Sequence, residues 1–330
     1  LRSSNVQNRS LAFEDNVYVG TDNYNPVQEN DILICVRNGS KNLIGKNALI
    51  NKENEGIAFG AFMSIYRSSF NRFLFHWFDT NEYKEIVHKN LGATINSING
   101  SDLRKFKVPF PSVEEQNKLA SFLSLVDERI QTQNKIIEQL ETLIKGLSEK
   151  LFLQEIRFKE FTDKWELKKL GDISTITTGS SNREDSILNG EYTFFDRSQD
   201  IRTSSRFLFD KEAVIVPGEG QEFIPKYFIG KFDLHQRTYA IFDFRGINGK
   251  YLYYHLLNDD KYLQSQAVGS TVKSLRLPMF QSMPIKSPCL DEQTTIANFL
   301  SVIETKIQTE KNILDKYHCQ KQYLLQNLFI

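Results

Sequence analysis

The sequence predicts an α+β protein in which two globular α/β domains alternate with two long coiled-coil helices. Three observations lead to this prediction. One segment occurs twice, each copy carries a heptad seam, and each copy follows an apolar strand pattern and an aromatic helix pattern. The predicted plan is a first domain at 1–110, a helix within 111–157, a second domain at 158–284 and a helix within 285–330.

The repeated segment is the strongest of these signals. Residues 111–152 and 288–329 align without gaps at an offset of 177, so that Pro111 pairs with Pro288. Identical residues recur along the alignment, as where Phe122-Leu123-Ser124 pairs with Phe299-Leu300-Ser301. Because a domain-sized stretch separates the two copies, the repeat indicates a duplicated domain–helix unit rather than an ordinary coiled coil.

Apolar residues in both copies recur at alternating steps of four and three, which predicts a coiled-coil seam. A helix of about 40 residues is about 60 Å long, and its apolar stripe must be buried, with the other copy as the obvious partner. Polar residues at Gln133, Glu310 and Lys321 are expected to weaken this pairing but to fix its alignment. The pattern leaves the orientation of the helices open. The predicted seam includes Leu123, Val126, Ile130, Ile137, Leu140, Leu147, Leu300, Ile303, Ile307, Leu314, Tyr317 and Leu324.

The composition narrows the class of function. The 41 basic and 41 acidic side chains give no net charge, which disfavours a non-specific nucleic-acid binder that depends on phosphate neutralisation. The three cysteines lie far apart and the histidines are not at ligand spacing with them, so we expect no metal site and a reducing, cytoplasmic location. No apolar run reaches the length of a membrane span, so no membrane partner is expected.

The sequence shows no catalytic constellation. The adenine methyltransferase pattern Asn-Pro-Pro-Tyr/Phe and the glycine-rich phosphate loops are absent. Glu219, Glu222 and Lys226 do not have the spacing of a nuclease metal pair, and His235 is expected to be a structural or DNA-facing residue rather than a general base. We therefore predict a chain without catalytic residues.

With catalysis disfavoured, we expect the chain to bind a ligand. The candidate binding residues are the polar side chains that gather in the segments between predicted strands. Base edges are read by Arg, Lys, Asn, Gln, Ser and Thr, and phosphates are held by Arg, Lys and small polar groups. The predicted DNA-binding residues of the first domain are Arg37, Asn38, Ser40, Lys41, Thr94 and Asn96. Those of the second domain are Ser180, Asn182, Arg183, Arg197, Gln221, His235, Gln236, Arg237, Thr271 and Lys273.

Three motifs carry a resemblance to a known family. The helices open with PSVEEQ and PCLDEQ, the second domain opens with WELKKLGDI at 165–173, and a G-[AS]-T turn precedes each helix. This arrangement resembles the specificity subunits of Type I restriction-modification systems over essentially the whole chain. The resemblance implies two target-recognition domains, each reading one half of a split and asymmetric DNA site. It also implies that the spacer helices pack antiparallel.

The resemblance further implies double-stranded DNA, methyltransferase (M) subunits and restriction (R) subunits as partners. No cofactor is then expected in this chain, whereas S-adenosylmethionine, ATP and Mg are expected on the partner subunits. The first domain departs from the pattern, because it has no counterpart of residues 165–173. By alignment Leu1 falls inside the repeated unit, so this domain is expected to be N-terminally incomplete.

Two other interpretations stay open. One is a non-catalytic coiled-coil interaction protein that displays two binding modules. The other is the recognition part of a fused restriction-methylation enzyme, which a longer reading frame with Asn-Pro-Pro-Tyr would reveal. In the main interpretation the helix length acts as a ruler between the two half-sites.

Overall fold

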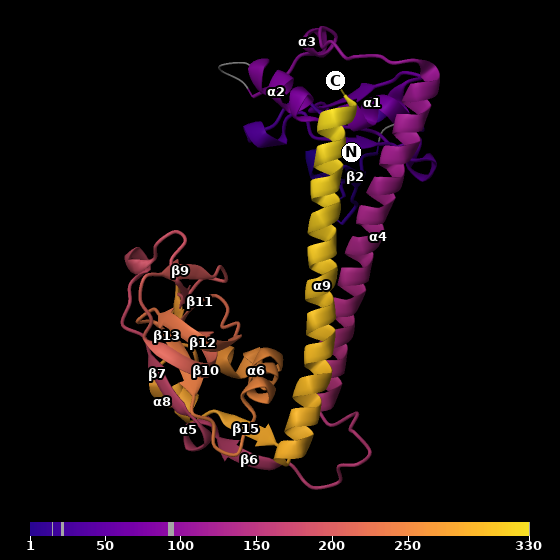
Figure 1. Cartoon of the computed structure of the whole chain (residues 1–330). Coiled ribbons are helices and arrows are strands. Elements are labelled where there is room, and N and C mark those ends of the chain that lie inside the picture. The colour runs from indigo at the N-terminus through magenta and orange to yellow at the C-terminus, as the bar shows by residue number, and fades with distance from the viewer. Residues whose placement is uncertain (15, 21–22, 92–95, 330) are drawn as a thin grey trace. The chain divides into compact units, whose positions relative to one another are not determined.

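The computed structural model describes residues 1–14, 16–20, 23–91 and 96–329 (Figure 1). The chain forms two compact units, which are described separately below. Unit 1 consists of Leu1–Lys135 with Lys311–Ile330, and unit 2 consists of Ile136–Glu310. Each unit therefore contains one globular domain together with a part of both long helices.

Unit 1 is built around a three-stranded antiparallel sheet in the order β4-β3-β5. These strands are Asn47–Leu49, Ile32–Cys35 and Met63–Tyr66. All four residues of the middle strand are buried, because the sheet is covered on both faces. Ile32 and Ile34 belong to one apolar cluster, and Leu33 and Cys35 belong to another, as the alternation of side chains along a strand requires.

Short helices complete the first domain. One face of the sheet is covered by aromatic residues of α1 (Asn71–Trp77) and α2 (Asn81–Lys89), among them Phe73, Trp77 and Tyr83. The aromatic helix pattern that the sequence shows in the first domain thus corresponds to α1, which ends at Trp77. The remaining elements are η1 (Ser3–Asn5), β1 (Val6–Gln7), β2 (Ser10–Leu11), η2 (Lys41–Leu43), η3 (Lys52–Asn54) and α3 (Gly100–Leu103).

Unit 2 contains a larger sheet of six strands in the order β7-β13-β10-β12-β8-β9. Neighbouring strands are antiparallel except for β12 and β8, which are parallel. In chain order the strands are β7 (Thr175–Thr178), β8 (Tyr192–Phe195), β9 (Arg202–Ser204), β10 (Phe209–Pro217), β12 (Lys226–Leu234) and β13 (Thr238–Phe242). The apolar strand pattern that precedes the second copy of the repeat lies in β10, at the middle of this sheet.

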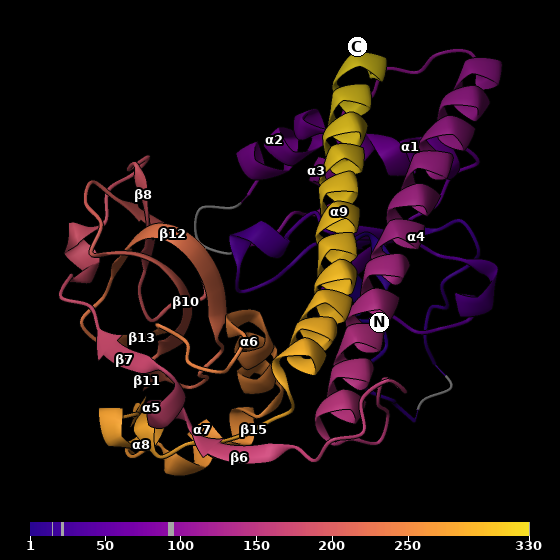
Figure 2. The ribbon, with the colours of Figure 1, turned by 60° about the horizontal axis from the view of Figure 1, so that its bottom comes forward.

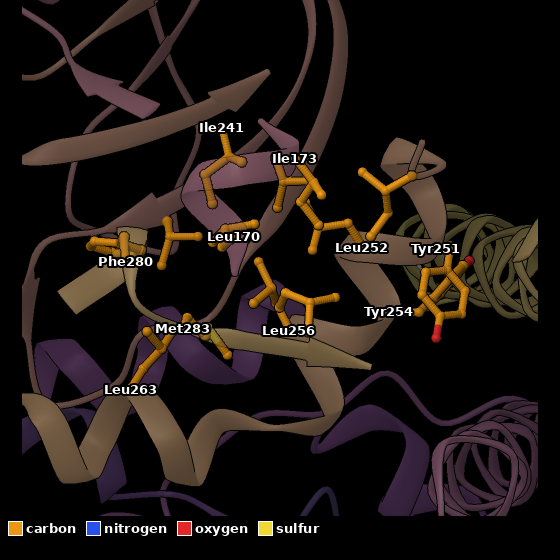
Figure 3. Close-up of a cluster of buried hydrophobic side chains, with 14 of the residues drawn as sticks. Leu170, Ile173, Ile241, Tyr251, Leu252, Tyr254, Leu256, Leu263, Phe280 and Met283 are labelled. Carbon is orange, nitrogen blue, oxygen red and sulfur yellow. The ribbon is translucent and has the colours of Figure 1, made fainter. Parts of the chain in front are cut away.

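A helical layer packs on this sheet through a large apolar cluster (Figure 3). Ile241 of the sheet, Leu252 and Leu256 of α6, and Phe280 of α8 are all fully buried in it. The helices of this domain are α5 (Leu170–Ile173), α6 (Gly249–Asn258), α7 (Asp260–Gln266) and α8 (Leu277–Gln281).

The WELKKLGDI segment closes the second domain. Its β6 (Glu166–Lys169) pairs antiparallel with β15 (Pro284–Ser287), which directly precedes the second long helix. Leu170 and Ile173 follow β6 on a helical turn and enter the apolar cluster. In the first domain the residues equivalent to β15 are 107–110, and they form no strand.

The two long helices are α4 (Val113–Phe152, 40 residues) and α9 (Leu290–Leu328, 39 residues). They run antiparallel, as Figures 1 and 2 show. In unit 1 the first part of α4 contacts the last part of α9, where Lys321 pairs with Asp127. In unit 2 the last part of α4 and the first part of α9 contribute to one apolar cluster, through Leu151 and Leu300 respectively. The predicted class, with two domains and two long antiparallel helices, is confirmed.

Burial along both helices follows the heptad pattern. Every seam position that the sequence singled out is buried or half-buried, and most of the residues between them are exposed. Gln133, Glu310 and Lys321 are buried as well. Near the end of α9 the buried stripe is wider than the predicted seam, because Leu325 is buried beside the half-buried Leu324. Among the helices that the structure describes, none is both long and apolar enough to cross a membrane.

The repeated glutamine of the helix openings has a local structural role. The side chain of Gln116 donates a hydrogen bond of 2.8 Å to the carbonyl of Pro111, and Gln293 makes the same 2.8 Å bond to Pro288. The hydroxyl of Ser112, which precedes α4, accepts a hydrogen bond from the backbone N–H of Glu115 at 3.3 Å. These bonds fix the chain direction where each helix begins, which explains why both copies need Gln at this position.

A buried histidine makes the stability of unit 2 depend on pH. His255 lies on α6 against the rings of Phe152 and Tyr251, and burial lowers the pKa of its imidazole from 6.5 to about 4. The unfolded chain therefore binds the proton more readily than the folded chain between these two values. Stability is full above about pH 6.5 and is lost as the pH falls toward 4.

We expect the free energy of unfolding to drop by about 2 kcal/mol from pH 7 to pH 5 on account of this histidine. The variant His255→Phe should lose about 2 kcal/mol less than wild type over that range, as measured by urea unfolding at both pH values. The control is His318→Gln, measured in the same way, because His318 of α9 is exposed. An equal pH dependence of wild type and His255→Phe would contradict this assignment.

Candidate nucleic-acid interface

In the second domain, two polar loops lie side by side at one end of the large sheet. The turn between β12 and β13 carries Gln236, whose side chain donates to Asn182 at 2.6 Å. The backbone N–H of Gln236 also donates to the carbonyl of Ser181 at 2.9 Å. The structure thus brings the predicted DNA-binding segments 180–183 and 235–237 together, with Ser180, Asn182 and Arg183 exposed.

A buried carboxylate supports these loops from below. Asp233 is fully buried and accepts hydrogen bonds from the hydroxyls of Ser181, at 2.6 Å, and Ser204, at 2.9 Å. The guanidinium of Arg206 lies 3.7 Å from the same carboxylate and donates to Ser181. A buried charge that is paired and hydrogen-bonded in this way fixes the conformation of the loop that carries Asn182 and Arg183.

The sequence predicts His235 to be a structural or DNA-facing residue, and the structure shows a local structural contact. Its side chain is buried, and its Nδ1 accepts a 3.0 Å hydrogen bond from the backbone N–H of Arg237. Burial and the nearby Arg197 and Arg237 lower the pKa of this imidazole, which favours the neutral form. His235 therefore shapes the turn that displays Gln236 and Arg237, and its Nδ1 is already occupied within the chain.

Two predicted arginines meet at one carboxylate. Arg197, which follows β8, contacts Glu219 with 2.8 Å between Nη1 and Oε2, and Arg237 contacts the other oxygen of Glu219. The sequence predicts Gln221 in a polar segment between strands. The two residues before it, Glu219 and Gly220, instead form a short strand, β11, which pairs with β14 (Lys273–Ser274). Gly220 has a φ of +149°, a conformation that favours glycine.

The remaining predicted residues of the second domain border this strand pair. Gln221 donates to the carbonyl of Thr271 at 3.3 Å, and the ammonium of Lys273 lies 3.1 Å from the side-chain oxygen of Gln264. Hydrogen bonds and ion pairs thus connect five segments of the second domain that are distant in sequence, namely 180–183, 197, 219–221, 235–237 and 271–273. The result is one polar surface with alternating basic, amide and acidic groups.

The first domain has a smaller cluster of the same kind. Arg37 and Ser97 form an isolated β-bridge, and the side chain of Asn96 donates to the carbonyl of Gly39 at 2.9 Å. Asn38 accepts from the backbone N–H of Ser40, and Lys41 is exposed at the start of η2. The structure therefore brings together these five residues of the first domain. The sixth, Thr94, lies outside the described residues.

The two clusters occupy equivalent places. Ser97 and Ser274 are related by the repeat offset of 177. Ser97 pairs with Arg37, and Ser274 pairs with Glu219. The position opposite the repeated serine thus carries a cation in the first domain and a carboxylate in the second.

Each domain is also attached to its following helix by equivalent side chains. In unit 1, His76 of α1 lies 3.2 Å from the hydroxyl of Ser124 and 3.6 Å from the carboxylate of Asp127. In unit 2, Tyr254 of α6 lies 3.3 Å from the hydroxyl of Ser301 and donates to Glu304 at 2.7 Å. The serines and the acids are again related by the repeat offset. The duplication therefore extends to the contacts that hold each domain on its helix.

Two carboxylates of this arrangement were not predicted from the sequence. Glu219 was weighed as a nuclease ligand, and Asp233 was not a candidate, although its place in an apolar strand stretch is a signal for a buried carboxylate. Among the described residues, no group of three or more His, Cys, Asp or Glu side chains could hold a metal ion.

Comparison with known proteins agrees with this arrangement. The sequence model described as Type I restriction modification DNA specificity domain matches residues 5–142 and again residues 162–316. The chain belongs to this family. Each match covers one domain and part of the long helix that follows it, so the specificity domain occurs twice, as the internal repeat predicted.

Curated relatives carry the same family name. The Type I restriction enzyme EcoDI specificity subunit of Escherichia coli is 29% identical over 152 residues, which are 46% of this chain and 34% of that protein. The putative MjaX specificity subunit of Methanocaldococcus jannaschii is 25% identical over 333 residues, which cover 89% of this chain and 76% of that protein. The match to the EcoDI subunit thus spans about a third of that relative's length.

Solved structures show the same fold. The crystal structure of a Type I restriction-modification S subunit from M. genitalium superposes with a TM-score of 0.66 at 18% identity, covering 94% of this chain and 85% of that one. A chain from a structural study of complex assembly and conformational transition of the Type I R-M system superposes with a TM-score of 0.54 at 16% identity. That match covers 92% of this chain and 82% of the other.

Proposed function

We propose that this chain is the sequence-reading subunit of a Type I restriction-modification complex. Its two domains each recognise one half of a bipartite DNA site, and its long helices bind the methyltransferase and restriction subunits. The observation that carries this proposal is the duplicated specificity domain, with a polar surface at the same place in each copy. Because the two surfaces differ in sequence, the two half-sites differ as well.

The chemistry of the polar surfaces supports recognition of DNA. Both contain arginine and amide side chains, which can form bidentate hydrogen bonds with guanine and adenine in the major groove. Carboxylates alternate with the basic groups in the second domain, so affinity does not come mainly from neutralising phosphates. We infer that the partner subunits contribute much of the phosphate contact.

In this proposal the chain itself is not catalytic. Methyl transfer and DNA cleavage belong to the M and R subunits, which use S-adenosylmethionine, ATP and Mg. The cytoplasmic location and the role of helix length in setting the spacing of the half-sites stay predictions.

Methylome sequencing tests the proposal directly. Cells that lack other methyltransferases and express this chain with its M subunits should methylate a two-part, asymmetric motif with unspecified bases between the parts. Replacing Arg237 by Ala should weaken discrimination in one half of the motif by about 10- to 100-fold and leave the other half unchanged. Expression of the M subunits alone is the control and should give no such motif.

A motif that is undivided, or that appears without this chain, would contradict the proposal. If the chain were part of a fused restriction-methylation enzyme, expression of its full reading frame without M subunits would be enough to methylate the DNA. An interaction protein would give no methylation at all.

A further inference from the structure

The polar surface of the second domain has an acidic side chain, Glu219, at its centre, and a carboxylate does not serve to bind phosphate. Glu219 lies in β11, and its side chain is 13% exposed, whereas those of Arg197 and Arg237 are 45% and 57% exposed. Each carboxylate oxygen contacts one of the two guanidinium groups. The acid therefore lies beneath the two arginines and leaves part of each guanidinium accessible from outside.

The backbone holds this carboxylate in a fixed position. Glu219 pairs with Ser274 in β14, and the preceding Gly218 donates a 2.9 Å hydrogen bond to the carbonyl of Arg237 and accepts a 2.8 Å bond from Leu275. A Cβ atom at residue 218 would lie 2.8 Å from that carbonyl oxygen of Arg237. Glycine is thus needed for β11 to lie this close to the turn that carries Arg237.

We propose that Glu219 determines the specificity of the second domain by positioning Arg197 and Arg237 for base recognition. This inference rests on the proposed function and adds to it the residue that sets discrimination. A guanidinium reads guanine through two parallel hydrogen bonds, so the plane of the group must be fixed. A carboxylate that is already bound to one edge of the guanidinium fixes that plane before DNA arrives.

The same carboxylate also weakens binding to the wrong DNA. Non-specific affinity depends on the positive charge offered to phosphates, and Glu219 offsets part of the charge of the two arginines. A phosphate that approaches them meets a fixed negative charge, whereas a base edge does not carry a net charge. Glu219 thus lowers affinity for non-cognate DNA and raises the ratio between cognate and non-cognate binding.

The equivalent place in the first domain supports this role. There the residue opposite the repeated serine is Arg37, whose guanidinium lies 5.6 Å from the ring centre of Phe62. The residue opposite the repeated serine therefore has opposite charge in the two domains. We infer that Arg37 contacts DNA itself, whereas Glu219 acts through its two arginines, and that this difference contributes to the difference between the half-sites.

The test compares Glu219→Gln with Glu222→Gln in the complete complex with M subunits. Both variants remove one negative charge from the same surface, but Glu222 is exposed and contacts Gln199 only through a 3.2 Å hydrogen bond. Binding is titrated against the methylated motif, against duplexes with one base pair changed in either half, and against unrelated DNA at several salt concentrations.

For Glu219→Gln we expect non-specific affinity to rise by about twofold to fivefold and to depend more steeply on salt. Discrimination in the second half-site should fall by about tenfold, with discrimination in the first half-site unchanged, which also shows that the complex is folded. Glu222→Gln should keep both discrimination ratios.

Equal second-half discrimination in the two variants would overturn the inference. A wild-type complex that does not discriminate between cognate and unrelated DNA would instead overturn the proposed function, so the two failures are distinguishable.

Discussion

Replacing Leu300 by alanine is expected to destabilise unit 2 by about 3 kcal/mol. Leu300 lies on α9, is fully buried, and belongs to the apolar cluster that also contains Leu252 of the second domain and Leu151 of α4. Removing its three outer carbon atoms leaves a cavity whose walls come from several elements. Because these elements support one another, we expect the cavity to collapse only in part.

The measurement is chemical denaturation followed by tryptophan fluorescence, since Trp165 lies at the edge of the same cluster. Val302 on the same helix is 70% exposed, and Val302→Ala should change the free energy of unfolding by less than about 0.5 kcal/mol. Leu123, the repeat equivalent of Leu300, is also fully buried, so Leu123→Ala should destabilise unit 1 by a similar amount.

A loss below about 1 kcal/mol for Leu300→Ala would mean that α9 contributes little to the core of unit 2. The spacer helix would then be an appendage of the domain. The expected value instead makes the helix part of the domain, connected to it through packed side chains.

The long helices could be predicted in detail because their pattern is local. The heptad seam from Leu123 onward depends only on residue spacing, and the helices begin within two residues of the predicted openings at Pro111 and Pro288. The antiparallel orientation was not accessible from spacing, since either orientation would bury the same stripe. It came from the resemblance to a family.

The polar surfaces were predictable in composition but not in arrangement. The sequence indicated Arg197 and Arg237 as candidates, but they lie 40 residues apart. The pairing of β11 with β14 and the hydrogen bond from Gly218 to Arg237 place Glu219 between them. Such pairing depends on long-range hydrogen bonds that a local pattern does not encode. The burial of His235 was not predictable for the same reason, because it follows from the way two strands meet.

Lys321 was interpreted from the sequence as a polar residue that weakens the seam, and the structure gives it a stabilising role. Its side chain is 9% exposed, and its ammonium lies 2.6 Å from Asp127 of α4 and 2.6 Å from Asp79. One cation therefore connects α9 to α4 and to the loop between α1 and α2. In the first copy of the repeat the equivalent residue is Ile144, so the ion pairs belong to unit 1 alone.

Replacing Lys321 by alanine is therefore expected to cost about 3 kcal/mol in the free energy of unfolding at pH 7. Asp79 keeps two other cations, Arg9 at 3.5 Å and Lys84 at 3.6 Å. Asp127 keeps His76, whose imidazole has a pKa lowered by burial to about 4 and is neutral at pH 7, and the electrostatic attraction of Arg9. Most of the cost thus comes from leaving the Asp127 carboxylate without a cation in direct contact among the described residues.

The pH dependence of this variant separates the ion pair from simple packing. Lys321 is one of the charges that lower the pKa of His76, so its removal raises that pKa and lets the imidazolium form beside Asp127. Folded Lys321→Ala then takes up the proton at a higher pH than wild type, and its stability falls less between pH 7 and pH 5. The difference in free energy of unfolding between wild type and Lys321→Ala should therefore be smaller at pH 5 than at pH 7, as measured by urea unfolding. The control Lys316→Ala, on the exposed face of α9, should not lower the free energy of unfolding at either pH. A loss that is the same at both pH values would assign the effect to the buried methylene groups of Lys321 and not to its charge.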